Sequence, residues 1–477
     1  MKREAPLPPE LWDQISPTVQ AVLVLIVEGY EQRIANLEAE VAGLKAQLGQ
    51  NSQNSSRPPS SNGPHVKRKP PQAPSGGNHG AQPGRPVHRR VLVPVEAVSE
   101  VVVCNPTRCR RCGRSVSGSD PAPWRQQVID VPVPVPVITE YQLHRLLCAS
   151  CGITTCGELP KGVTSTCYGP RLASVVALCS GAYRMSKRMV ASLFRDVLGV
   201  ELAVGEICRI EQMVTEAVAP VVEEAQLYVQ TGDTNVDETP WNEHHQRRWL
   251  WTVVTAQVSV FAIATSRGAV VLEALLGELY VGIVTSDRAK AYDTRLVRER
   301  QLCWAHFARD FPAMIDRGEP AQSVGEVLLE HTQVLFAWWH WVRDGTWARS
   351  TFQPYVQSLR ASFRGELEKG STCACPKTAV TCRELLAKEP TLWTFVRIEG
   401  IEPTNNLAER QLRHAVQWCK TSYSTQSEQG SRFVAHILTV VTTCQQQRRS
   451  VLSYLTACCE AFYAGRGVPS LLSHTRS

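Results

Sequence analysis

The first regular pattern along the chain is an apolar residue at alternating spacings of four and three positions. Such spacing places apolar side chains on one seam of a helix, as in a coiled coil. The seam consists of Leu23, Val27, Tyr30, Ile34, Leu37, Val41, Leu44 and Leu48. Residues 1–50 are therefore predicted to form a coiled-coil oligomerisation helix, although a helix packed within its own chain would show the same pattern.

After residue 50, a stretch rich in Asn, Ser, Pro and Gly ends the helical pattern, and residues 51–95 are predicted to be a linker. This segment contains seven Lys or Arg residues and no Asp or Glu, in a chain whose net charge is +7. A basic linker suits a polyanion such as DNA, and it also suits solubility alone. The candidates for DNA contact in it are Lys67, Arg68, Lys69, Arg89 and Arg90.

Two CxxC pairs follow, Cys109 with Cys112 and Cys148 with Cys151. Two such pairs complete the tetrahedral thiolate shell of a structural Zn²⁺ ion. The intervening Val- and Pro-rich segment is predicted to be an extended ribbon at a sheet edge, because proline cannot donate to a ladder. Residues 96–165 are therefore predicted to be a zinc-binding β module, with four unrelated buried cysteines as the alternative.

Helical spacing covers residues 166–227, where Gly199 separates two amphipathic stretches. Two helices joined by a glycine-containing turn are typical of a DNA-reading helix-turn-helix and also of ordinary core helices, and both interpretations stay open. Residues 426–477 are predicted to be a C-terminal helical region.

From residue 228, short runs of Val, Ile, Thr and Trp predict strands. Three such runs, a helical stretch and a fourth run suggest a mixed sheet with a helix on its face. Asp237 and Asp287 are predicted to lie at the ends of the first and fourth strands. Carboxylates beside apolar runs are costly unless they are exposed, paired or bound to metal, and an ordinary turn or cap role is the alternative for each.

Two aspartates and a third carboxylate from a later helix would suffice to hold Mg²⁺, which prefers oxygen ligands. Two such ions, about 3.5–4 Å apart, serve in-line displacement at a phosphodiester. The later segment 402–413 contains Glu409, whose local sequence fits a capping box with Asn406 and an ion pair with Arg413, so an active-site role for this residue stays open at this point. Asp233, on the same predicted strand face as Asp237, is the rival for the first position.

Four motifs, VDETPW, SDRAKAYD, CWAHFARDF and EPTNNLAERQLR, occur in this order and resemble the catalytic-domain signatures of transposases of the insertion sequence 66 family. That family is similar to the aspartate-aspartate-glutamate transposases, whose catalytic core has an RNase H-like fold. The resemblance implies that Asp237, Asp287 and Glu409 hold Mg²⁺ or Mn²⁺ within an RNase H-like domain at residues 228–425. The 121 residues between Asp287 and Glu409 exceed this core. Residues 312–400 are therefore predicted to be a helical insertion whose tryptophans pack a core.

Other residues of these segments have roles that the sequence leaves open. His306 is a candidate to contact DNA, to orient a catalytic group or to be an ordinary core histidine. Arg410 and Arg413 are candidates for phosphate contact or for pairing with Glu409. The insertion also contains Cys373, Cys375 and Cys382, which are candidates for a second metal site or are buried thiols.

Taken together, the sequence predicts a multidomain α/β DNA transposase that hydrolyses a phosphodiester at element ends and transfers the freed 3′-hydroxyl to target DNA. Its expected partners are element-end and target DNA, a second copy bound through the coiled coil, and companion transposition proteins. The apolar run at residues 21–27 is too short to span a membrane, and 17 cysteines are a poor disulfide framework, so a reducing cytoplasm is expected. The resemblance implies that this is a bacterial cytoplasm, with the protein at the nucleoid. The alternatives are a catalytically inactive regulator that binds element ends and a structural scaffold.

Overall fold

The computed structural model describes residues 8, 12–48, 91–163, 166–295 and 299–472, which fall into two compact units. The larger unit contains both sheets and nearly all of the helices. The linker residues predicted to contact DNA lie outside the described residues: Lys67, Arg68, Lys69, Arg89 and Arg90. None of the described helices is both long enough and apolar enough to cross a membrane.

The predicted coiled-coil segment forms helix α2, Pro17–Leu48. Its apolar seam is largely exposed in the single chain, with Tyr30 at 64% and Ile34 at 54% exposure. An uncovered apolar stripe on one helix is what a coiled-coil partner would cover. Pairing through this seam stays a prediction.

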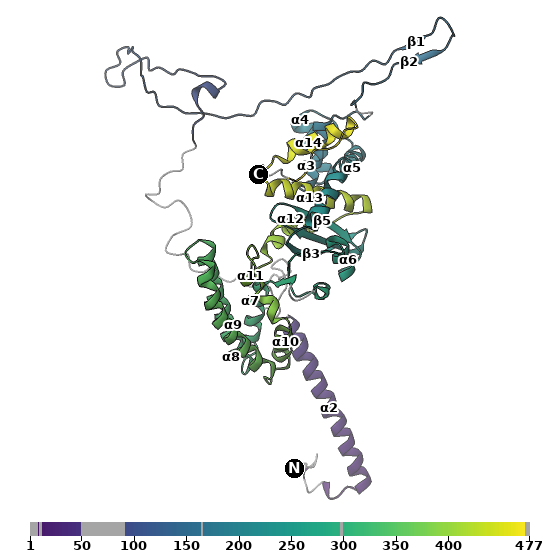
Figure 1. Ribbon diagram of the computed structural model, residues 1–477, viewed down its shortest axis with the longest axis vertical. Coiled ribbons are helices and arrows are strands. Elements are labelled where there is room, and N and C mark those ends of the chain that lie inside the picture. The colour runs from purple at the N-terminus through teal and green to yellow at the C-terminus, as the bar shows by residue number, and fades with distance from the viewer. Residues whose placement is uncertain (1–7, 9–11, 49–90, 164–165, 296–298, 473–477) are drawn as a thin grey trace. The chain divides into compact units, whose positions relative to one another are not determined.

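Helices from two distant parts of the chain pack into one helical layer (Figure 1). The layer consists of α3 (Pro170–Gly181), α5 (Val204–Val229), α13 (Glu428–Gln446) and α14 (Val451–Tyr463). α4 (Lys187–Leu198) precedes Gly199, whose φ of 66° permits the turn into α5. The helices expected on either side of Gly199 are thus present, and α5 extends two residues past the predicted boundary at 227.

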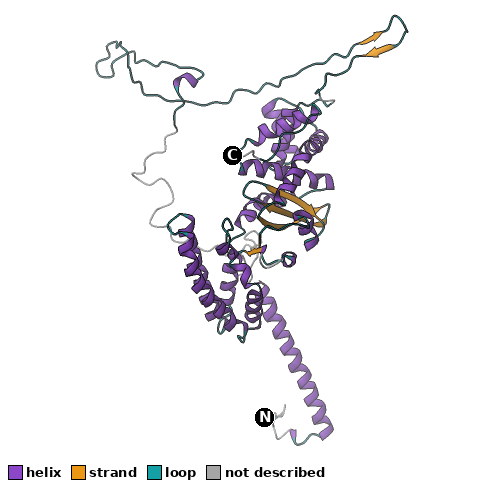
Figure 2. Ribbon diagram, viewed as in Figure 1, coloured by secondary structure: helices purple, strands orange, loops and turns teal. Residues whose placement is uncertain are grey.

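A five-stranded mixed sheet with the order β5-β4-β3-β6-β7 lies next to this layer (Figure 2). Its strands are β3 (Thr234–Glu243), β4 (Gln246–Val254), β5 (Ser259–Ala264), β6 (Val284–Ser286) and β7 (Arg300–Leu302). β3, β4 and β5 are antiparallel, whereas β3, β6 and β7 run parallel. α6 (Ala269–Leu276) connects β5 to β6, and the 3-10 helix η3 (Lys290–Thr294) follows β6. The prediction of a mixed sheet is confirmed, with β7 as an additional strand.

The edge strand β5 is covered by α13 through two threonines one helical turn apart. The hydroxyl of Thr439 accepts the Phe261 N–H at 3.0 Å, and that of Thr443 accepts the Ser259 N–H at 3.1 Å. Backbone donors at a sheet edge need such partners when they are buried. α13 therefore closes the sheet at its β5 edge.

Helices fill the chain between β7 and α12 (Asn406–Ser422). They are α7 (Trp304–Ile315), α8 (Ala321–Arg343), α9 (Arg349–Ser371), α10 (Pro376–Ala387), the 3-10 helix η5 (Glu389–Leu392) and α11 (Thr394–Arg397). These helices begin at Trp304, earlier than the predicted boundary at 312. Their core includes Trp304, Trp339 and Trp393, which confirms that Trp339 of the Trp-rich segment packs inside.

Candidate active site

Asp237 and Asp287 are brought to the same level of the sheet by the parallel pairing of β3 and β6. Asn235 lies opposite Thr285, and each aspartate stands two positions further along its strand. β6 ends at Ser286, directly before Asp287, as predicted. The strand-end prediction is wrong for Asp237, which lies inside β3 because this strand continues into its hairpin with β4.

Glu409 lies near Asp237 because hydrogen bonds hold the start of α12 against the sheet. The side-chain amide of Asn405 donates to the carbonyl of Val236, the neighbour of Asp237, at 2.9 Å. The Asn405 backbone N–H donates to Cys303 Sγ at 3.1 Å. Since Glu409 lies in the first turn of α12, these two bonds hold it beside β3.

The expected capping box and helical ion pair at Glu409 do not occur within the described residues. The N-cap of α12 is Asn405 and not Asn406, and no side-chain cap bond forms there. The basic side chains beside Glu409 Oε1 are His306, with Nδ1 at 3.8 Å, and Arg309, with a nitrogen at 3.9 Å, whereas Arg413 is exposed. The asparagine at this helix start serves packing on β3 instead of capping.

The carboxylates of this site act on one another electrostatically. Burial raises the pKa of Asp237 well above its usual value, and the charges of Glu238, Asp287 and Glu409 raise this pKa further. The acceptor Asp237 Oδ1 receives one hydrogen bond, from the Glu238 N–H at 2.9 Å. Like charges gathered in this way favour either a proton or a bound cation.

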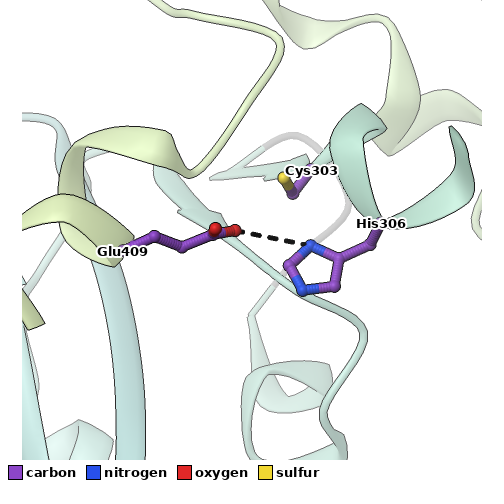
Figure 3. A group of neighbouring side chains, drawn as sticks. All are labelled: Cys303, His306 and Glu409. Atoms are coloured by element: carbon purple, nitrogen blue, oxygen red, sulfur yellow. Dashed lines mark ion pairs between the residues drawn. The ribbon is translucent and has the colours of Figure 1, made fainter. Parts of the chain in front are cut away.

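Figure 3 shows Cys303, His306 and Glu409 together beside this site. Their ligating atoms lie within 4.8 Å of one another, and no other trio of His, Cys, Asp or Glu in the described chain meets so closely. Burial, followed by the charge of Arg309, lowers the pKa of His306, while Glu409 and Asp287 act in the opposite direction. Burial raises the pKa of Cys303 to about 12. The structure thus places His306 against the proposed third carboxylate.

A network that sequence reasoning missed connects the buried Glu238 with Asp287 through the half-exposed Arg267. Arg267 Nε donates to Glu238 Oε1 at 2.6 Å, and an Arg267 nitrogen lies 3.9 Å from Asp287 Oδ2. The Tyr292 hydroxyl donates to the other oxygen of Glu238. Glu238 lies in the same motif as Asp237, and Tyr292 lies in the same motif as Asp287. Their place in these motifs is the sequence signal that could have identified them. Arg267 lies outside all four motifs, and no sequence signal singles it out.

A pocket of about 500 Å³ opens next to Asp287 and His306, and three cationic side chains contribute to its lining. These are Arg267, Arg288 and Lys290. Arg288 is paired with Asp310, whereas Lys290 is exposed and forms no ion pair within the described residues. Positive charge beside a carboxylate cluster suits a phosphate oxygen.

The remaining candidates lie away from the carboxylates. Asp233 precedes β3, about 13 Å along the strand from Asp237, and its Oδ1 accepts the Ile283 N–H at 2.7 Å. Arg410 lines, with Asp233, a different pocket of about 510 Å³. The structure therefore gives Asp233, the rival for the first position, a bond that holds two backbone segments together.

The two CxxC segments form the same turn. In each, the carbonyl of the first cysteine accepts the N–H of the glycine after the second cysteine, at 2.9 Å. These glycines, Gly113 and Gly152, have φ values of 72° and 73°, which a residue with a side chain rarely adopts. Backbone N–H groups of the turn lower the pKa of Cys109 and of Cys148. The turns thus favour the thiolate form, which binds zinc.

The predicted ribbon does not form in the segment between these turns, where β1 (Arg145–Leu147) is the one strand of the described residues. β1 pairs antiparallel with β2 (Thr154–Cys156), which follows the second turn, so these two short strands flank that turn. The described residues 118–144 contain no strand, since their alternating prolines cannot donate to a ladder. The sharing of one Zn²⁺ ion by Cys109, Cys112, Cys148 and Cys151 stays a prediction.

The cysteines of the insertion do not form a three-ligand group in the part of the chain that the structure describes. Cys382 is buried, and the thiol of Cys373 donates to the carbonyl of Cys375 at 3.6 Å. This geometry favours packed thiols over a second metal site.

Two segments of the chain match known protein families. Residues 165–432, more than half of the 477 residues, match the family described as Transposase IS66 family. Residues 7–91 match a family of unknown function, DUF6444. No curated protein matches the chain. The first match spans the sheet, the helices between β7 and α12, and all four motifs, and the chain therefore belongs to the IS66 family of transposases.

Proposed function

We propose that this transposase cuts DNA at the ends of its element with divalent metal ions held by Asp237, Asp287 and Glu409. The observation that carries the proposal is the placement of carboxylates on β3, at the end of β6 and in the first turn of α12, where their charges add to the effect of burial in raising the pKa of Asp237. In the described residues the oxygens of these three carboxylates do not all lie within 4.8 Å of one another, and a bound cation would draw them closer. The mixed sheet, in which two aspartates stand level on adjacent parallel strands, supports an RNase H-like core.

The donors of this site fit Mg²⁺ or Mn²⁺. Carboxylate oxygens are the preferred ligands of both ions, and Glu409 Oε1 is buried without a hydrogen-bond partner in the described structure. Bound there, a pair of ions would polarise the phosphodiester and stabilise charge on the attacking and leaving oxygens. The mutual repulsion of the carboxylates supports binding, since a cation would relieve it.

The side chains of the pocket next to Asp287 would position the DNA strand. Lys290 is free to bind a phosphate oxygen, and Arg267 stays fixed between Glu238 and Asp287. In the first step, the oxygen of water bonds to phosphorus and the bond to the 3′ oxygen breaks, which leaves a 3′-hydroxyl on the element. In the second step, that hydroxyl attacks a phosphodiester of target DNA, and the target strand is released at its own 3′ oxygen.

The test is Mg²⁺-dependent nicking of element-end DNA by the full chain. Wild type is expected to nick, whereas Asp237→Asn, Asp287→Asn and Glu409→Gln are expected to lose at least about 10³-fold in rate while still binding DNA. Asp233→Asn is the matched control and should nick as wild type does. Equal nicking by all variants would remove the assignment, and binding without nicking by wild type would favour the catalytically inactive regulator.

The other parts of the chain would serve DNA binding and assembly. The basic linker would bind phosphate and lose affinity as salt rises. The zinc-binding turns and the helices around Gly199 would add contacts, and α2 would join protomers, because two element ends must be brought together. The binding of companion transposition proteins stays a prediction.

A further inference from the structure

His306 and Glu409 face each other across a gap too wide for a hydrogen bond (Figure 3). His306 stands in the first turn of α7, just after β7, and Glu409 in the first turn of α12. His306 Nδ1 lies 3.8 Å from Glu409 Oε1, whereas an N–H···O bond has its atoms about 2.7–3.2 Å apart. The two atoms therefore point at the same space without joining.

Both of these atoms are buried, and neither has a hydrogen-bond partner in the described structure. A buried polar atom without a hydrogen-bond partner destabilises the fold, so two such atoms that face each other indicate a third group between them. Two ligands that are each about 2.1 Å from one ion lie about 3.0–3.4 Å apart. A small side-chain rotation would bring Nδ1 and Oε1 into that range.

Cys303, the third member of this group, is already engaged. Its Sγ accepts the Asn405 N–H at 3.1 Å, and its side chain is 1% exposed. That bond holds the start of α12, and it orients the sulfur toward the helix backbone. The imidazole of His306 and the carboxylate of Glu409 are thus the free pair, and Arg309, at 3.9 Å from Oε1, is the competing cation.

We propose that His306 Nδ1 is a direct ligand of the ion held by Glu409, which makes one metal position of this transposase a mixed nitrogen and oxygen site. The proposal rests on the proposed function, because it needs an ion at Glu409. Imidazole suits Mn²⁺ and later transition ions better than Mg²⁺. His306 therefore biases this position toward Mn²⁺, which a site made only of carboxylates would not do.

The test is pulsed electron paramagnetic resonance of Mn²⁺ bound to the full chain, which detects a nitrogen atom bonded to the ion. Wild type should show nitrogen hyperfine coupling, and His306→Asn should lose it. The asparagine oxygen can take the place of Nδ1, so this variant keeps bound Mn²⁺ with a smaller loss of affinity than His306→Ala, for which we expect at least about a tenfold loss.

His331→Asn is the matched control, because His331 also has a buried Nδ1 without a hydrogen-bond partner but lies on α8. It should leave the nitrogen coupling unchanged. If wild type binds Mn²⁺ without nitrogen coupling, His306 is not a ligand of the ion. A water molecule between His306 Nδ1 and Glu409 Oε1 would then explain the 3.8 Å that separate these atoms. If such protein still nicks DNA, the proposed function stands, whereas wild type that neither binds Mn²⁺ nor nicks DNA overturns both.

Discussion

Replacing Asp237 by Asn should make the metal-free protein more stable while it removes DNA cleavage. Burial raises the pKa of Asp237, the charges of neighbouring carboxylates raise it further, and no cationic side chain of the described residues forms an ion pair with it. Its hydrogen bond from the Glu238 N–H needs only a carbonyl-type oxygen, which asparagine also offers. The substitution therefore removes a charge and keeps the contact.

The size of the gain follows from the charges around Asp237. A like charge about 8 Å away costs about 2 kcal/mol at an effective dielectric constant of about 20. Burial of the carboxylate and the charges of Glu238, Asp287 and Glu409 all contribute in this sense, while relaxation and counter-ions reduce the total. We expect the free energy of unfolding to rise by about 1–3 kcal/mol, within the usual range for single substitutions. For a domain of about 150–250 residues, each kcal/mol raises Tm by about 2–4 °C.

The gain should depend on pH with a definite sign. The pKa of Asp237 is higher in the folded than in the unfolded state, where it is about 3.9. At a pH below about 3.9 the carboxyl group is protonated in both states, and its raised pKa does not lower the free energy of unfolding. Stability is lost progressively as the pH rises from that value through the raised folded pKa. Asparagine cannot ionise, so the difference between Asp237→Asn and wild type should vanish near pH 4 and reach its full size above the raised pKa.

The assay is thermal unfolding at pH 8 after dialysis into buffer without Mg²⁺, repeated with added Mg²⁺ or Mn²⁺. Added metal should raise Tm of wild type and have a much smaller effect on Asp237→Asn. Asp233→Asn is the control, because Asp233 accepts a backbone N–H and should keep the full metal response. A metal-free Asp237→Asn protein that is less stable than wild type, or an equal metal response in both proteins, would refute the reasoning.

Three further predictions concern other parts of the chain. Arg360→Ala should lower the free energy of unfolding by about 1–3 kcal/mol in denaturant, because the buried Glu389 loses the partner of two hydrogen bonds while Arg360, 37% exposed, is partly screened by solvent. The matched change in an exposed pair, Arg364→Ala, should cost less than about 1 kcal/mol, and equal costs would contradict this account. Metal analysis of reduced wild type should find zinc, and Cys148→Ser should lower its content; zinc-free wild type would remove the site. Ile34→Asp in the exposed seam of α2 should shift the sedimentation coefficient toward the monomer, and an unchanged coefficient would exclude pairing through this seam.

Much of the fold could be predicted from the sequence because it is encoded in local periodicity. α2 and the helices on either side of Gly199 follow from the spacing of apolar residues, and the first strands follow from β-branched runs. β7 was missed because its residues, Arg300–Leu302, include no β-branched residue, whereas β6, equally short, follows a run of Val and Ile. The ribbon near the CxxC segments was overestimated, since extended chain rich in proline has no ladder to join.

The motifs identified the candidate residues of the site, whereas tertiary packing determined which of their side chains lie close together. The sequence by itself selected Asp237, Asp287 and Glu409 as carboxylates able to hold metal. Only the folded chain decided that Asn405 fastens α12 to β3, a bond across 169 residues. It also decided that Arg267 stands between Glu238 and Asp287, and that His306 faces Glu409. The physical reason is that local sequence sets backbone conformation within a few residues, whereas the distance between remote side chains depends on strand register and helix packing.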